Sequence, residues 1–145
     1  MESKSTGELI HEIKNATDVE DYLIENKQYL LTRNLSEYLN MLLCKRDIRK
    51  ADVARNSLLD RVYVYQIFSG RKVPSRDKLI AISFGMHLSD EETNTMLKLS
   101  GNRELYARDE RDAIILFALQ RKMNISDTNE LLFNHGLEVL GSMKE

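Results

Sequence analysis

Cysteine, proline and long apolar runs are all scarce in this sequence. Cys44 is the only cysteine and Pro74 the only proline in 145 residues. A single cysteine excludes an internal disulfide framework, and we interpret Cys44 as a small buried hydrophobic residue. The longest uninterrupted apolar run, 113–119, is far shorter than the roughly 20 residues of a membrane-spanning helix. The N-terminal stretch "MESKSTGELI" has no apolar signal core. We therefore expect a cytoplasmic protein that does not interact with a membrane.

The residue patterns of catalytic and metal sites are also missing. His11, His87 and His135 are too scattered for a local ligand motif, and the glycines form no phosphate-binding loop. The acidic runs "DEETN" and "RDERD" fit helix starts, where carboxylates complement the helix dipole, better than paired catalytic acids. The sequence therefore predicts no enzyme, no catalytic residue, no metal and no cofactor.

What the sequence does contain is helical periodicity. Apolar residues in one segment recur at i, i+3, i+4, i+7 and i+8, which places on one helix face Leu35, Tyr38, Leu39, Leu42 and Leu43. Comparable patterns predict further helices at about 50–57, 61–69, 75–86, 90–99, 109–122 and 127–135, with at least one acidic helix between 7 and 30. No segment shows sustained period-two alternation, so we expect an all-α fold.

Several short motifs mark candidate helix starts. An oxygen acceptor precedes an acid by three residues in three pairs, Thr17 with Glu20, Asn34 with Glu37, and Ser89 with Glu92. Ser75, Asp109 and Ser126 are further candidates for N-caps. No linker or repeat separates these helices. We divide the chain into an N-terminal helical segment (1–33), a central domain (34–100) and a C-terminal helical extension packed on it (101–145).

Charge is unevenly distributed along the chain. The net charge is −2, yet residues 45–78 hold ten Lys or Arg against four Asp, a balance of +6, and the remainder carries −8. Such segregation concentrates an attractive field for an anion at one place. The alternative is a solvated basic face that has no partner.

The basic region contains two helical patterns, "RKADVARNS" and "RVYVYQIFSG", joined by the short turn "LLD". At 100° per residue, one face of the second pattern holds Tyr63, Val64, Ile67 and Phe68, which we expect in the core. The opposite face is expected to point outward, and it holds Arg61, Val62, Tyr65, Gln66 and Ser69.

These residues resemble a known family. Residues 35–100, and above all 50–89 with the loop "SGRKVPS", are similar to the lambda-repressor-like (Cro/repressor, XRE-type) helix-turn-helix family of bacterial and phage transcription regulators. The resemblance implies a five-helix domain that binds double-stranded DNA. It implies base-facing roles in the major groove for Arg61, Val62, Tyr65, Gln66 and Ser69. It implies phosphate contacts from Lys50, Arg71, Lys72, Ser75 and Arg76.

The sequence departs from the family pattern at three positions. Leu58 and His87 stand where glycine is common. A left-handed backbone is expected to be strained at Leu58, where a turn of different shape is the alternative, and to be better tolerated by His87. Phe68 stands where many relatives carry glutamate and is expected to add apolar area. The apolar Val62 and Tyr65 on the outward face also suit a protein partner, so the alternative is a protein-interaction module that keeps the fold.

The two flanks hold apolar residues at helical spacing. In the N-terminal flank they are Leu9, Ile10, Ile13, Val19, Tyr22, Leu23 and Ile24, and in the C-terminal flank Ile114, Ile115, Phe117, Ala118, Leu131, Leu132 and Phe133. We expect most of this surface to pack on the central domain. Repressor-type domains usually need two copies on a two-fold site, so either flank is a candidate for homodimerisation. The tail around "ELYARDERDAII" is also similar to helical extensions of some Firmicute regulators.

Overall fold

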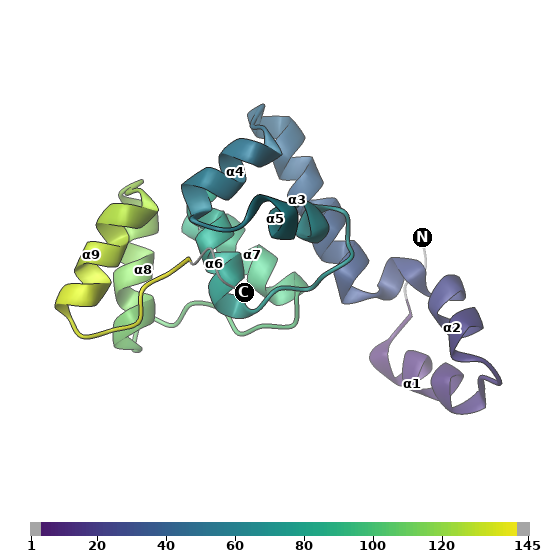
Figure 1. Ribbon diagram of the computed structural model, residues 1–145. Helices are drawn as coiled ribbons and strands as arrows, with labels where there is room; N and C mark the ends of the chain where they lie inside the picture. Colours follow the sequence, from purple (N-terminus) through teal and green to yellow (C-terminus); the bar gives the residue numbers. More distant parts are fainter. Residues whose placement is uncertain (1–3, 142–145) are drawn as a thin grey trace.

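In residues 4–141 of the computed structural model the regular elements are helices joined by turns and loops, with no β-strand, which confirms the predicted all-α class (Figure 1). The N-terminal unit, residues 4–30, comprises α1 (Thr6–Asn15), α2 (Val19–Glu25) and the 3₁₀ helix η1 (Lys27–Tyr29). The body comprises α3 (Leu31–Arg46), α4 (Lys50–Ser57), α5 (Arg61–Phe68), α6 (Arg76–Gly85) and α7 (Asp90–Leu99). Two more helices follow, α8 (Glu110–Gln120) and α9 (Ile125–Asn134). Residues 1–3 and 142–145, the ends of the first and last predicted segments, lie outside the described residues.

Three helices start at the N-caps that the sequence predicted. Ser75 and Asp109 cap α6 and α8, and Ser89 with Glu92 forms a complete capping box on α7. Three predictions were wrong. Asn34 lies inside α3, and the caps of α2 and α9 are Asp18 and Asn124 rather than Thr17 and Ser126. In both of these helices an acceptor close by in the sequence takes the cap position.

One continuous hydrophobic core joins the body to the C-terminal helices. It begins with the buried stripe of α3, Leu35, Leu39 and Leu42, and extends to Ile115 in α8 and Leu132 in α9. Cys44 is exposed, so its predicted burial was wrong. It lies two residues after Leu42, about 200° around the helix, and therefore points away from the stripe.

Helices α4 and α6 cross at very short range because Gly85 has no side chain. A Cβ at Gly85 would lie 2.6 Å from the Val53 carbonyl oxygen and would also collide with the Ser57 hydroxyl. α4 therefore sits directly against α6, and this contact holds the α4–α5 pair on the body.

Two residues that are not glycine adopt the left-handed backbone that glycine favours. Leu58, at the turn between α4 and α5, has φ 58°, and His87, after α6, has φ 56°. Left-handed backbone is unfavourable for a residue with a Cβ by about 1–2 kcal/mol. The sharp turn after α4 is therefore kept without glycine.

Leu58→Gly is expected to stabilise the fold. It relieves the left-handed strain of about 1–2 kcal/mol, from which about 0.5–1 kcal/mol of extra unfolded-chain entropy must be subtracted. We expect the free energy of unfolding in urea to rise by roughly 0.5–1 kcal/mol. Leu58→Ala keeps the Cβ and is the matched control, which should give no gain. A loss of stability in the glycine variant would show that contacts of the leucine side chain outweigh the strain.

The N-terminal unit differs from our expectation that its apolar residues pack on the central domain. Side chains of both of its helices are exposed, among them Ile10, Ile13, Val19 and Ile24. In Figure 1 the unit stands apart from the body, which it joins at α3. No helix in residues 4–141 combines the length and the apolar character needed to cross a membrane.

Candidate nucleic-acid interface

Helix α5 presents the two faces that its periodicity predicted. Val64, Ile67 and Phe68 are buried and Tyr63 is half-buried. On the other face the exposed fraction is 62% for Val62 and 41% for Tyr65. Arg61 and Ser69 are also exposed, Gln66 is half-buried, and the Ser69 hydroxyl donates to the Gln66 carbonyl over 3.0 Å.

Both ends of α5 are fixed by hydrogen bonds. Asp60 caps the first turn by accepting from the Tyr63 N–H over 3.2 Å. At the other end the Phe68 carbonyl accepts from Ser36 over 2.7 Å and from Asn40 over 2.8 Å, and both donors lie on α3. The outward edge of α5 is therefore held in one orientation relative to the body.

The loop after α5 carries cations beside that edge. Gly70, at φ 82°, ends the helix, Arg71 and Lys72 are exposed, and Ser75 accepts from the Lys78 N–H at the start of α6. In Figure 1 this loop runs from the end of α5 round to α6. The loop thus places positive charge next to the exposed side of the helix.

Two lysines of this region lie near the half-buried ring of Tyr63. The ammonium of Lys72 lies 5.5 Å and that of Lys78 5.1 Å from its centroid, within the range of a cation–π contact. Sequence reasoning missed Lys78. Its position three residues after the Ser75 cap was the available signal, because it places the lysine on the first turn of α6, near the loop.

Lys50 lies at the start of α4, on the same side of the body as the end of α5. Its side chain is half-buried, and its ammonium is 5.9 Å from the centroid of the buried Phe68 ring. Phe68 is thus a core residue, as its place in the helical pattern predicted, and it positions a cation at the start of α4.

Arg76 is placed differently from the other predicted phosphate contacts. Its guanidinium donates to both carboxylate oxygens of Asp112, at 3.1 and 2.9 Å, and to the carbonyls of Arg103 and Glu104. Only 15% of the Arg76 side chain is exposed. These bonds direct it to the C-terminal extension, so we remove Arg76 from the candidate contacts.

Between α4 and α5 lies a groove that the sequence did not reveal. Its volume is ≈ 400 Å³, and it is lined by Ala51, Ala54, Arg55, Leu58, Leu59 and Arg61. Arg55 and Arg49 both bond to Asp52, at 2.7 and 3.2 Å, and these two contacts lower the pKa of the Asp52 carboxyl. Of the residues that line the groove, Arg55 and Arg61 are cationic, and Arg55 is paired with Asp52.

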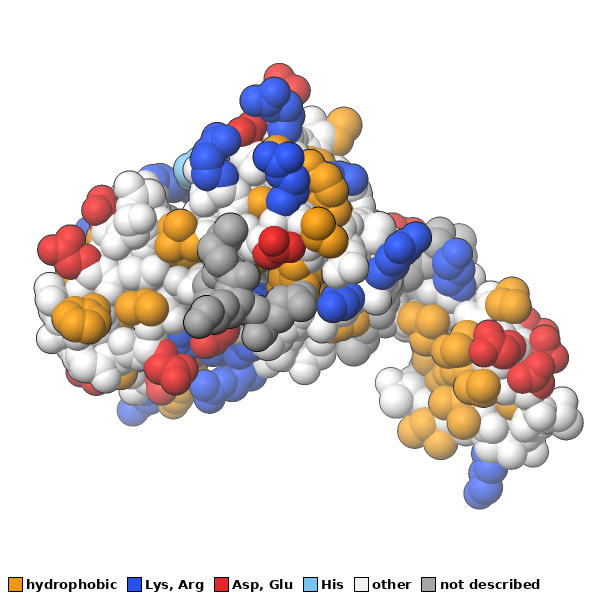
Figure 2. All heavy atoms as spheres, viewed as in Figure 1, with side chains coloured by type: hydrophobic (Ala, Val, Ile, Leu, Met, Phe, Trp, Pro, Cys, Tyr) orange, Lys and Arg blue, Asp and Glu red, His pale blue; other side chains and the backbone are white. Residues whose placement is uncertain are grey.

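The outward edge of α5 is not covered by the terminal helices within residues 4–141, as the exposure of Arg61, Val62 and Tyr65 shows. Figure 2 shows Lys and Arg side chains gathered over the part of the body that contains α4 and α5. This surface is open to a large partner and is predominantly cationic.

Comparisons of the chain with protein-family models, with curated proteins and with solved structures found no match. Within the described residues, no group of three or more His, Cys, Asp or Glu side chains is placed to hold a metal ion.

Proposed function

We propose that the chain is a sequence-specific regulator that binds double-stranded DNA, with α3–α7 as a lambda-repressor-like helix-turn-helix domain and α5 as the recognition helix. The observation that carries this proposal is the exposed edge of α5 beside the cationic loop 70–75. An exposed, positively charged helix edge on a rigid support is what a duplex groove requires.

The dimensions of α5 support the proposal. It is a helix of eight residues, and an α-helix with its side chains is about 10–12 Å in diameter, which fits the major groove of about 12 Å width. Arg61 stands at the N-terminal end, the end that such domains insert toward base edges. Arginine forks onto guanine, glutamine pairs with adenine, and Val62 is suited to a thymine methyl group.

The phosphate contacts follow from the same orientation. Lys50, Arg71, Lys72 and Ser75 are the predicted contacts that surround the α5 edge, and Lys78 joins them in our proposal. Contacts of this kind fix the register of the protein on DNA without reading sequence. They also make affinity depend on salt, because each neutralised phosphate releases counterions.

Arg61→Ala is expected to weaken binding to the preferred DNA site by about 1–3 kcal/mol and to blur its sequence selectivity. The site is first obtained by selecting bound fragments from a random DNA library, and affinities are then measured by fluorescence anisotropy. Arg108→Ala removes the same charge from an exposed position before α8 and is the control. Equal affinities for the two variants would contradict base reading by Arg61.

Lys72→Ala is expected to weaken binding to all DNA sequences alike. The slope of log affinity against log salt should fall by about one phosphate contact. Lys98→Ala, on α7, is the matched control and should leave the slope unchanged. An unchanged slope for Lys72→Ala would remove the loop from the interface.

A protein-interaction module is the second candidate function. It is favoured by the exposed apolar Leu58, Val62 and Tyr65 and by the groove between α4 and α5. If the random library yields no bound fragment, or if neither Arg61→Ala nor Lys72→Ala changes DNA binding, this function replaces DNA recognition.

A further inference from the structure

The N-terminal unit presents an exposed apolar face that the core does not use. Ile10 and Ile13 on α1 and Val19, Leu23 and Ile24 on α2 are all exposed, and the exposed fraction reaches 71% at Ile24. None of the residues from 4 to 30 belongs to the hydrophobic core, which begins at Leu35. Apolar side chains gathered on a folded surface in this way mark an interaction site.

The charge of the unit indicates the chemistry of its partner. Residues 4–30 contain three lysines and six carboxylates, a net charge of −3. Lys4 forms an ion pair with Glu12, and its ammonium also donates a hydrogen bond to the side-chain oxygen of Asn26. Figure 2 shows acidic side chains directly beside the apolar cluster of this unit. A complementary partner therefore has exposed apolar groups among cations.

The α5 face of this chain has that combination. Val62 and Tyr65 are exposed between Arg61 and the cationic loop, and Leu58 lies at the edge of the adjoining groove. The surrounding segment 45–78 has a charge balance of +6. The same protein thus carries two exposed surfaces of mixed apolar character and opposite charge.

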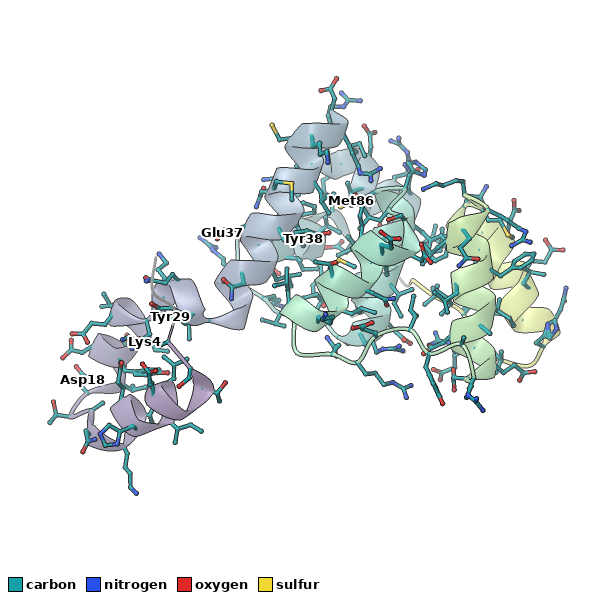
Figure 3. The ribbon with its side chains drawn as sticks, turned by 180° about the vertical axis from the view of Figure 1, so that it is seen from behind. Lys4, Asp18, Tyr29, Glu37, Tyr38 and Met86 are labelled. Carbon is teal, nitrogen blue, oxygen red and sulfur yellow. The ribbon has the colours of Figure 1, made fainter. Side chains whose placement is uncertain are left out.

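The connection between unit and body favours contact between two molecules over contact within one. A single residue, Leu30, separates η1 from α3, and η1 packs against α3. The Lys4 ammonium lies 5.7 Å from the centroid of the Tyr29 ring, which ties the start of the unit to η1 (Figure 3). So short a link restricts folding of the unit back onto its own α5.

We infer that the apolar, acidic face of the N-terminal unit binds the α5 face of a second copy of this chain. Two such contacts form a reciprocal two-fold dimer, in which each unit covers the partner's recognition surface. The inference rests on the proposed function insofar as the covered surface is the one that contacts DNA. Self-association and DNA binding are then mutually exclusive.

Charge reversal on each surface tests the reciprocal contact. Glu20→Lys/Glu25→Lys reverses charge beside Ile24, and Arg61→Glu/Lys72→Glu reverses it on the α5 side. Analytical ultracentrifugation of the full chain without DNA is expected to show dimerisation roughly ten-fold weaker, or more, for each variant alone. An equimolar mixture should form a heterodimer, because both of its contacts pair opposite charges. Circular dichroism checks that every variant is folded.

An uncharged variant tests the competition with DNA. Val19→Ser/Ile24→Ser should weaken the dimer and raise affinity for the selected DNA fragment several-fold at protein concentrations where wild type is dimeric. Thr95→Ala, an exposed substitution on α7, is the control.

Four results overturn the inference. The first is a monomer at all concentrations, and the second is the absence of a heterodimer in the mixture. The third is weakening by the N-terminal variants alone, which indicates contact between two N-terminal units. The fourth is a gain in DNA affinity of Val19→Ser/Ile24→Ser that persists at concentrations where wild type is monomeric, which indicates contact within one chain. Reciprocal dimerisation without DNA binding supports the inference and contradicts the proposed function. DNA binding by a protein that never dimerises contradicts the inference alone.

Discussion

Asp112→Ala is expected to lower the free energy of unfolding by about 3–5 kcal/mol, because it leaves a buried charge without its partner. Asp112 is 1% exposed and accepts from both terminal nitrogens of Arg76 and from the Tyr106 N–H. Without the carboxylate, the guanidinium of Arg76 keeps only backbone carbonyl acceptors. Urea denaturation measures the effect.

A double-mutant cycle measures the coupling free energy between Arg76 and Asp112. Arg76→Met/Asp112→Leu removes both charges and should recover a large part of the lost stability, since a well-packed apolar pair often replaces a buried ion pair without loss. If the double variant is as unstable as the sum of the single variants, the two side chains are not coupled. DNA affinity of the folded double variant should match wild type, because Arg76 is outside the proposed interface.

The same pair makes stability depend on acid. Burial by itself raises the pKa of the Asp112 carboxyl, but hydrogen bonds from Arg76 and the Tyr106 N–H outweigh burial, and the net pKa is lowered. A carboxyl whose pKa is lower in the folded state stabilises the fold above its unfolded pKa of about 3.9, and this contribution is lost as the pH falls through the folded value. Asp112→Asn should therefore show a flatter loss of stability than wild type below about pH 4.

Phe68→Ala is expected to lower the free energy of unfolding by about 3–5 kcal/mol, as other truncations of buried phenylalanine do. Phe68 is 1% exposed at the end of α5. The cavity would open where α5 is bonded to Ser36 and Asn40 of α3. Because the ring also faces the Lys50 ammonium, DNA affinity should fall together with stability.

Val62→Ala is the matched control for Phe68→Ala, on the same helix but on its outward face. Surface substitutions usually change stability by no more than about 0.5 kcal/mol, so this variant should unfold like wild type while its selectivity for thymine is reduced. A large loss of stability in Val62→Ala would contradict the assignment of the two faces.

Local sequence patterns were sufficient for most of the helices and for the orientation of α5. Helical periodicity and caps depend on residues within one or two turns, so Ser89 with Glu92 and the two faces of α5 were predictable. The left-handed backbone at Leu58 was not predicted in this way, because the strain of that conformation at a residue with a Cβ left the shape of the turn open.

Contacts between distant segments were decided by the tertiary structure. Arg76 has the charge and the position in the sequence that we expected of a phosphate contact. Its guanidinium instead binds Asp112, which is 36 residues away along the chain. The close crossing at Gly85 likewise depends on the backbone of α4. Neither partner can be identified from periodicity, because periodicity records which face of a helix is apolar and carries no information about which segment covers it.

The N-terminal unit illustrates the same limit. Its apolar residues at helical spacing predicted helices, and α1 and α2 are present. These side chains remain exposed and do not join the core, because η1 and α3 direct the unit away from it.

The sequence by itself determined the helices and the cationic segment, since both follow from neighbouring residues. Only the tertiary structure decided which cations stay exposed and which apolar face stays uncovered, because burial depends on how all the helices pack together.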